Sequence, residues 1–196
     1  MEHLVRPHAS GAAVSTVIIV EGQSDKVALE TLAERRGLDL AAAGVEITAI
    51  DGAHAIGRFI TGIRRERPDI ALRGLCDERE EPNFIRALER AGIDDNLDRA
   101  GLERIGFYVC VADLEDELIR ALGVEGVERV IEQQGELLSL RRLQAQPAQR
   151  GRTATQHLRR FISVRSGRKA KYARALVLAL DMDRVPRPLD AVLSEM

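Results

Sequence analysis

The sequence contains little of what marks secreted or membrane proteins. Its two cysteines, Cys76 and Cys110, are too few for a disulfide framework. No apolar run reaches the ~18 residues that a membrane-spanning helix requires. The N-terminus lacks a positively charged start followed by an apolar block, so we expect no signal peptide. These absences predict a cytoplasmic protein that has no membrane partner.

The signals for several cofactors are missing as well. There is no Cys-x-x-Cys pair and the four histidines are scattered, which argues against a zinc site. The phosphate-binding motif GxxxxGK[ST] is absent, so we expect no ATPase domain within these 196 residues. Aromatic residues make up only 3% of the chain, which makes base stacking a poor explanation for any nucleic-acid binding.

Acidic residues are absent from one long stretch, residues 137–180. This stretch contains eleven of the 29 basic residues and none of the 31 acidic ones. A basic segment joined to an acidic body is a pattern that favours contact with the phosphate backbone of a nucleic acid. A second interpretation stays open, in which the basic segment docks on the acidic body or on a partner protein.

Four short β-branched runs predict the strands of a sheet. They occupy residues 15–20, 45–50, 70–76 and 105–111, and the first and last are almost entirely apolar. Such strands are typical of parallel sheets that are covered on both faces. Helical patterns at 24–36, 53–66 and 82–91 separate the runs, with Ser24 as a predicted cap and Gly92 as a predicted helix end. The alternation predicts an α/β fold with a parallel sheet.

The last third of the chain is predicted to be helical throughout. Its helical patterns span residues 124–134, 136–145, 153–162, 168–181 and 187–195. We therefore divide the chain into a flexible tail (1–13), an α/β domain (14–122) and a basic helical extension (123–196).

Carboxylates follow the predicted strands repeatedly. Glu21 ends the first strand and precedes Gly22, and Asp25 lies one turn into the next helix. The other strands lead into Asp51, into Asp77, Glu78, Glu80 and Glu81, and into Asp113, Glu115, Asp116 and Glu117. Because the carboxyl ends of parallel strands meet at one edge of a sheet, these acids are expected to gather there. Mg²⁺ prefers such oxygen ligands, so the pattern predicts a divalent cation.

A simpler explanation covers single members of this set. Acidic residues near a helix N-terminus are stabilised by the helix dipole, and Asp25, Glu81 and Glu115 could have no further role. The occurrence of acids at several strand ends, and of Glu21 directly after a buried strand, favours the cation site.

Three of these segments resemble a known domain. VEGQSD (20–25), GLCDERE (74–80) and VADLEDEL (111–118) resemble the motifs of the TOPRIM domain of topoisomerases, primases and nucleases. IDGAHAI (50–56) resembles its glycine turn, and SGRKAKYARAL (166–176) resembles a basic helix of the OLD (overcoming lysogenization defect) family of endonucleases. The resemblance covers residues 14–120 well and 121–180 loosely.

The resemblance implies a Rossmann-like four-stranded parallel sheet flanked by helices, which binds Mg²⁺ or Mn²⁺. Glu21, Asp25 and Asp77 match the family's acidic residues, and we add Asp113 and Glu115 to the expected metal ligands. The family's DxD motif departs here at Arg79, where Glu78 or Glu80 could substitute, and Glu117 stays open as a ligand. Lys169 and Lys171 are the expected cations at the scissile phosphate, although only one of them can face the site. The expected contacts to the nucleic-acid backbone are Arg159, Arg160, Arg165 and Arg168.

The implied function is metal-dependent endonuclease cleavage of DNA. OLD proteins normally contain an ATPase domain before the TOPRIM domain, so we expect a free-standing TOPRIM unit that acts alone or with a separate ATPase partner. One alternative is a catalytically weak accessory or binding module, which Arg79 favours. Another is a TOPRIM ribonuclease that processes RNA.

Overall fold

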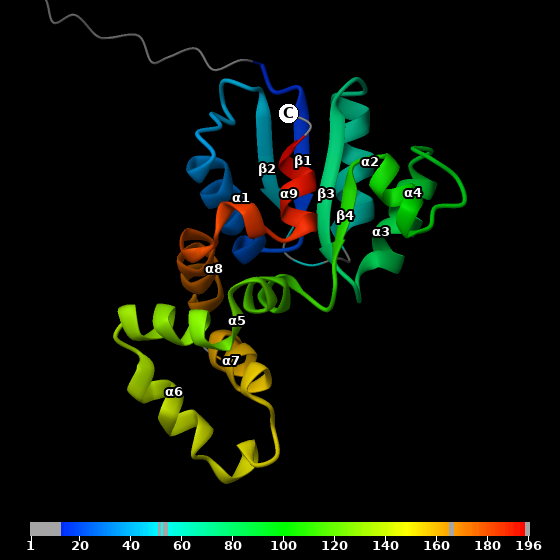
Figure 1. Ribbon diagram of the computed structural model, residues 1–196. Coiled ribbons are helices and arrows are strands. Elements are labelled where there is room, and N and C mark those ends of the chain that lie inside the picture. The colour runs from blue at the N-terminus through cyan, green and yellow to red at the C-terminus, as the bar shows by residue number, and fades with distance from the viewer. Residues whose placement is uncertain (1–12, 51, 53–54, 165–166, 195–196) are drawn as a thin grey trace, which may run out of the picture.

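Four parallel strands form the centre of the molecule, as the sequence predicts (Figure 1). The computed structural model describes residues 13–50, 52, 55–164 and 167–194. The strands are β1 (Thr16–Val20), β2 (Val45–Ala49), β3 (Ala71–Asp77) and β4 (Phe107–Cys110). They are parallel and lie in the order β2-β1-β3-β4. The predicted fold class, a four-stranded parallel sheet flanked by helices, is confirmed.

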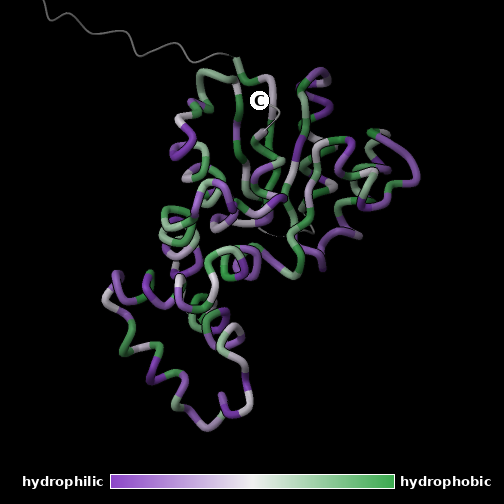
Figure 2. The backbone as a smooth tube through the Cα atoms, viewed as in Figure 1, coloured by the Kyte–Doolittle hydropathy of each residue, from purple (hydrophilic) through white to green (hydrophobic). Residues whose placement is uncertain are grey.

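Helices cover both faces of the sheet. They include α1 (Gln23–Arg35), α2 (Ile56–Glu66), α3 (Glu81–Arg90), α4 (Arg99–Arg104), α8 (Arg168–Ala179) and α9 (Arg187–Ser194). Alternate β1 residues point to opposite faces, so that Val17 and Ile19 pack with α2, α3 and α4, and Ile18 and Val20 pack with α1, α8 and α9. This double burial explains why β1 is apolar from Val17 to Val20; Figure 2 shows the hydropathy of each residue along the backbone.

A helical lobe extends from one end of the sheet (Figure 1). It contains α5 (Leu114–Gln133), α6 (Leu137–Gln144), the 3₁₀ turn η2 (Pro147–Gln149) and α7 (Ala154–Ser163). Gly123 interrupts α5 with a φ of 69° and a ψ of 166°, which a side chain would disfavour. After the lobe the chain returns to the sheet, where α8 packs against α1, and the 3₁₀ turn η3 (Met182–Arg184) leads to α9. Residues 123–196 therefore contribute both to the lobe and to the cover of the sheet.

Three local predictions differ from the structure. Helix α1 begins at Gln23 with Gly22 at the cap position, so the prediction of Ser24 as the cap is wrong. Helix α4 and the first half of α5 were not expected, because DRAGLER is short and LEDEL is rich in acids. Gly92 does follow the end of α3, with a φ of 66°. No helix in the described part of the chain is long and apolar enough to cross a membrane.

Candidate functional site

The candidate site lies where the direction of winding of the sheet changes. From β1 the chain moves outward through α1 to β2 and returns through α2, on the opposite face, to β3 on the other side of β1. In open α/β sheets ligands bind at such a switch point, beyond the carboxyl ends of the strands. Glu21 directly follows β1 and Asp77 ends β3, so both residues lie at this point.

A pocket of about 380 Å³ opens at this edge of the sheet. Five of the predicted site residues line it: Glu21, Asp25, Asp77, Glu115 and Lys169. The remaining lining consists of small or polar residues, which are Gly22, Gln23, Ser24, Gly52, Gly167 and Ala170. Segments that are far apart in sequence therefore bring four carboxylates and one ammonium group to a common cavity. Asp51, which the sequence placed at the end of the second strand, lies outside the described residues.

Glu21 joins the ends of the two central strands. One of its carboxylate oxygens, Oε1, accepts a hydrogen bond of 2.7 Å from the backbone N–H of Asp77. Burial raises the pKa of Glu21 above its usual value, the bond from Asp77 opposes this, and the negative charge of Glu80 adds to the rise. The carboxylate is thus held in place by the backbone while its other oxygen is left to the pocket.

Asp25 and Asp77 have strongly raised pKa values. Burial raises the pKa of Asp25 to about 7, although Gly22 donates its N–H to Asp25 Oδ2 at 3.0 Å. Burial, followed by repulsion from Glu21, raises the pKa of Asp77 to about 8. Carboxyl groups that are crowded and buried in this way resist being ionised together. A bound cation would remove that penalty, so the electrostatics of the pocket favour one.

Lys169 is the cation that the structure places in the pocket. Its Nζ lies 3.2 Å from Oε2 of Glu115, a buried carboxylate on α5. Burial lowers the pKa of Lys169, but the charges of Glu115, Asp113 and Asp77 outweigh this effect and raise it.

Lys171 lies outside the pocket. It pairs at 2.6 Å with Glu136 and lies beside the ring of Tyr172. Only one of the two lysines was expected to face the site, because residues two apart on a helix face different directions, and it is Lys169 that lines the pocket.

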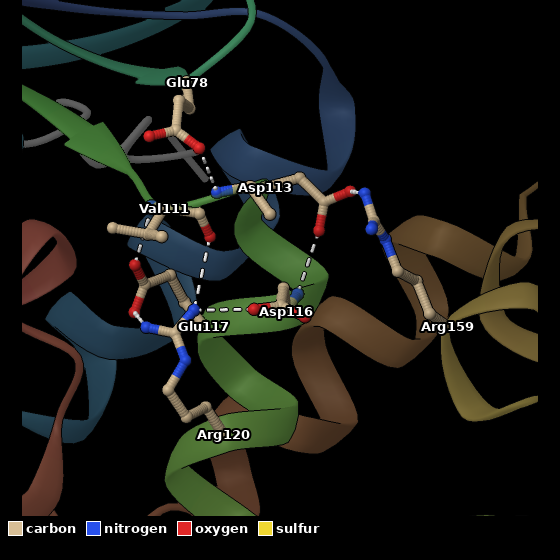
Figure 3. A network of polar contacts seen from close by, with 8 residues as sticks. Glu78, Val111, Asp113, Asp116, Glu117, Arg120 and Arg159 are labelled. Carbon is tan, nitrogen blue, oxygen red and sulfur yellow. Dashed lines mark hydrogen bonds and ion pairs between the residues drawn. The ribbon is translucent and has the colours of Figure 1, made fainter. Parts of the chain in front are cut away.

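Asp113 is already engaged on both of its oxygens (Figure 3). It caps α5 by accepting the N–H of Asp116 at 2.9 Å, and its second oxygen pairs with Arg159 on α7. The preceding residue, Ala112, has a φ of 66°, an unusual conformation for a residue with a side chain. Asp113 lies close enough to raise the pKa values of Glu21 and Asp77, but it would have to release Arg159 before it could bind a metal.

The neighbouring acids that the sequence left open have structural contacts. Glu117 is buried, accepts the N–H of Val111 at 2.8 Å and pairs with Arg120 (Figure 3). Glu78 accepts the N–H of Ala112 at 3.3 Å and pairs with Arg99. These contacts explain both carboxylates without a metal.

Arg79 and Glu80 occupy the place of the missing second DxD acid. Arg79 is exposed, whereas Glu80 lies near enough to Glu21 to raise its pKa. Glu80 is therefore the acid best placed to substitute for the residue that Arg79 replaces.

The carboxylates do not yet form a closed metal site. Within the described residues, no three acidic, histidine or cysteine side chains are arranged around one point in a way that could hold an ion. Some of their oxygens are occupied instead, by the N–H of Asp77, the N–H of Gly22 and the ammonium of Lys169. The donor chemistry fits Mg²⁺ or Mn²⁺, and side-chain rotation is needed to bring the donors together.

A basic cavity lies on α7. One of its lining residues, Arg159, forms an ion pair with Asp113 at the start of α5. Its volume is about 670 Å³, and it is lined by Arg152, Gln156, Arg159, Arg160, Ser163 and Val164. Two of the predicted backbone contacts, Arg159 and Arg160, are thus together. Arg152 belongs to the same surface, and its place within the acid-free stretch was the only sequence signal for it.

Arg168 is a structural residue. It is buried, donates to the carbonyl of Phe161 at 3.0 Å, pairs with Glu136 and lies 4.2 Å from the centroid of the Phe161 ring. Its guanidinium joins α7 to α8, so nothing in the described structure favours the predicted contact of Arg168 with nucleic acid. Arg165 lies outside the described residues.

Many basic side chains of the acid-free stretch are engaged within the protein. Among the basic side chains of this stretch that the structure describes, six pair with carboxylates: Arg141, Arg159, Arg168, Lys169, Lys171 and Arg174. Much of its positive charge therefore holds the helices together, and Arg152 and Arg160 are left on the surface of the basic cavity.

Residues 14–66 match the family model of the overcoming lysogenization defect protein-like TOPRIM domain. The resemblance to an OLD-like TOPRIM domain is confirmed. The fold is similar to that of the C-terminal region of the OLD protein of Xanthomonas campestris pv. campestris, with a TM-score of 0.67 and 23% identity over 92% of this chain and 90% of that one. The C-terminal region of the Burkholderia pseudomallei OLD protein gives a TM-score of 0.68 with 21% identity over 92% and 96%.

The similarity to the OLD C-terminal regions extends well beyond the residues that match the TOPRIM family model. Because it covers 92% of this chain, most of the helical lobe is part of the shared fold. No curated protein matches the sequence at a significant level.

Proposed function

We propose that this protein is a nuclease that hydrolyses phosphodiester bonds of DNA with the help of Mg²⁺ or Mn²⁺. The OLD-like TOPRIM domain supports a nuclease-type function in general. The observation that supports the finer proposal is the pocket at the switch point, where four carboxylates and Lys169 gather from β1, α1, β3, α5 and α8.

Glu21, Asp25, Asp77 and Glu115 are the residues that would hold the cation. Burial, followed by repulsion from neighbouring carboxylates, raises the pKa values of Glu21, Asp25 and Asp77. A bound cation would stabilise their ionised forms. When bound, one or two divalent ions supply an activated water and neutralise negative charge at the phosphate.

The chain's own residues then have separate tasks. Lys169 offers a positive charge at the pocket that can stabilise the negative charge growing on the phosphate. Glu21 fixes the end of β3 and thereby the position of Asp77. Glu115 holds the ammonium of Lys169 at 3.2 Å and so directs it toward the pocket.

The basic cavity on α7 would bind the phosphate backbone. Arg152 and Arg160 are exposed there, and Arg159 connects the cavity with Asp113 at the edge of the site. Contacts of this kind position a nucleic acid without reading its sequence, and they weaken as salt rises.

The test is the nicking of supercoiled plasmid with Mg²⁺ or Mn²⁺. We expect wild-type protein to nick, and Glu21→Gln and Asp77→Asn each to lower the rate by at least ~100-fold, the order seen when a group that stabilises the transition state is removed. Glu125→Gln, which removes an exposed acid on α5, is the matched control and should keep the wild-type rate. Nicking that both pocket variants retain would contradict the proposal.

A second candidate function is an accessory module that works with a separate ATPase partner. Two observations favour it: Arg79 replaces an acid, and no three donors converge in the described residues. Calorimetric titration with Mn²⁺ separates the two candidates, since folded protein that binds no Mn²⁺ excludes the metal-dependent enzyme. RNA that competes much better than DNA in the same binding experiments would instead indicate a ribonuclease.

A further inference from the structure

A second basic surface lies on the opposite face of the sheet from α8, between α2 and α3. Its concave part has a volume of about 560 Å³ and is lined by Gly57, Arg58, Thr61, Gly62, Arg65, Ala87 and Arg90. We call it the α2–α3 groove. The proposed nuclease site does not include any of these residues.

The three arginines of the groove are exposed and have no carboxylate within 4.0 Å in the described structure. This distinguishes them from other exposed arginines of the chain, such as Arg120, Arg141 and Arg187, which each pair with a glutamate. Three unneutralised guanidinium groups around one concave surface repel one another. They are therefore suited to an anionic ligand, and guanidinium groups match the geometry of phosphate.

The acids near the groove do not neutralise it. Glu81, in the first turn of α3, is held by Arg99, and Glu89 accepts the N–H of Leu97 at 3.1 Å. Glu66 ends α2 and is exposed.

The lining of the groove follows one face of α2. Arg58, Thr61 and Arg65 are spaced by three and four residues, so they share one face of α2. Seven residues of helix separate the two arginines by ~10 Å along its axis. Gly57 and Gly62 line the groove, and a Cβ atom added at either would meet open space, with no atom within 4 Å. A ligand can thus approach the backbone of α2 between the arginines.

The groove also leads away from the proposed site. Helix α2 follows the loop that contains Gly52, a lining residue of the carboxylate pocket, and α3 follows Asp77 within four residues. Both helices therefore begin at the carboxyl edge of the sheet. Arg58 lies in the first turn of α2, whereas Arg65 and Arg90 lie in the last turns of α2 and α3.

We propose that the α2–α3 groove binds the phosphate backbone of a nucleic acid on the side of the carboxylate pocket away from α7. The identity of the polyanion as nucleic acid rests on the proposed function. Charge complementarity supports this occupant: three unpaired arginines lie on two helices that begin at the carboxyl edge of the sheet, in a chain whose net charge is −2. Two separated basic surfaces would hold a strand on both sides of the bond to be cleaved.

The test compares two triple variants with equal loss of charge. The groove variant is Arg58→Gln, Arg65→Gln and Arg90→Gln. The control variant is Arg104→Gln, Arg129→Gln and Arg184→Gln, which changes three exposed arginines that form no ion pair in the described structure. Binding of a labelled DNA duplex is measured by fluorescence anisotropy in EDTA between 50 and 200 mM salt, the range over which ~10³–10⁵-fold losses of affinity are typical for extensive phosphate contacts. Circular dichroism confirms that each variant is folded.

The groove variant should show a smaller dependence of affinity on salt. The slope of log K against log salt is negative, and loss of three phosphate contacts reduces its magnitude by ~2.7, at ~0.9 for each contact. The control variant should retain the wild-type slope. Equal slopes for the groove variant and the control would overturn the proposal. So would a groove variant that binds DNA normally but changes its mass in light scattering, since the groove would then be a protein interface.

This experiment is independent of catalysis, because it uses no metal and measures no cleavage. If wild-type protein binds DNA through the groove but does not nick plasmid, the proposed reaction fails and the groove stands. If it nicks plasmid and the groove variant binds with the wild-type slope, the groove fails and the reaction stands.

Discussion

Two groups of carboxylates lie within a short distance of each other and have opposite surroundings. Glu21, Asp25 and Asp77 line the pocket with raised pKa values, and their nearest basic partner there is Lys169. At the start of α5, by contrast, Asp113 and its neighbours pair with Arg120 and Arg159 and cap backbone N–H groups (Figure 3). The ionised form of the carboxylates is thus disfavoured in the first group and stabilised in the second, because only the second group has arginine partners and backbone N–H groups close to most of its oxygens.

The largest effect is expected when the positive charge of Lys169 is removed from the carboxylate pocket. We expect Lys169→Met to lower the nicking rate ~100–1000-fold, since a group aimed at the charge of a transition state has an effect of that size. Lys171→Met is the matched control, because Lys171 pairs with Glu136 outside the pocket, and it should keep most of the activity. Initial rates of nicking at saturating metal measure both. Equal losses of nicking rate in the two variants would contradict a specific role of Lys169 at the phosphate.

The second prediction concerns the stabilised group. Glu117→Ala leaves the N–H of Val111 and the charge of Arg120 without their partner in a buried position. We expect the free energy of unfolding to fall by about 1–3 kcal/mol, the usual cost of leaving such groups unsatisfied. Urea unfolding followed by circular dichroism measures it. Wild-type stability in this variant would show that the network in Figure 3 is not structural.

In the pocket group, removing a carboxylate should increase the stability of the metal-free protein. In the absence of metal we expect Asp77→Asn to raise the melting temperature at pH 8, by ~2–4 °C for each kcal/mol in a chain of this size. The reason is that the variant removes a negative charge that Glu21, Asp25, Asp113 and Glu115 repel, and it keeps the backbone bond to Glu21. Differential scanning calorimetry in EDTA checks this, and a lower melting temperature than wild type would contradict it.

The pH dependence of the metal-free protein follows from the same charges. The pKa of Asp77 rises from an ordinary 3.8 to about 8 on folding and that of Asp25 to about 7, so the folded state binds more protons across this range. The free energy of unfolding should therefore fall as pH rises from about 4 to about 8. Asp77→Asn should flatten this decline in melting curves taken at each pH, and an unchanged profile would show that Asp77 titrates normally.

The smallest effect is expected at the ion pair between Arg159 on α7 and Asp113 at the start of α5. Arg159→Gln breaks the pair with Asp113 but keeps the cap from Asp113 to Asp116. We expect a loss of stability below ~1 kcal/mol, because the arginine is partly exposed. The magnitude of the slope of log K against log salt for DNA should decrease by ~0.9. A slope that does not change would place the DNA away from α7.

The sequence predicted the sheet and the core of the pocket well, because both follow from strong local patterns. β1 is apolar on both faces and must be buried, and Glu21, Asp25 and Asp77 follow strands whose ends meet at one edge. Motif resemblance added Lys169, which periodicity alone could not bring to the site. The family model and the similar OLD structures confirm the fold, and the roles of these residues remain predictions.

What the sequence could not predict depends on partners that are distant along the chain. Arg168 and Arg160 are both arginines in the same acid-free stretch, yet Arg168 is buried against Phe161 and Glu136 while Arg160 is exposed. Asp113 and Glu115 are two residues apart, but α5 directs Asp113 to Arg159 and Glu115 to Lys169. The helical start at Leu114 sets these directions, and its acid-rich sequence resembles a loop.

The most direct test of the central claim is a calorimetric titration of the folded protein with Mn²⁺, in parallel with Asp77→Asn and Glu117→Gln. If the carboxylates of the pocket form a metal site, wild type and Glu117→Gln will bind Mn²⁺, and Asp77→Asn will bind it at least ~10-fold more weakly. Wild-type protein that is folded and binds no Mn²⁺, or Asp77→Asn that binds it as tightly as wild type, would contradict the account.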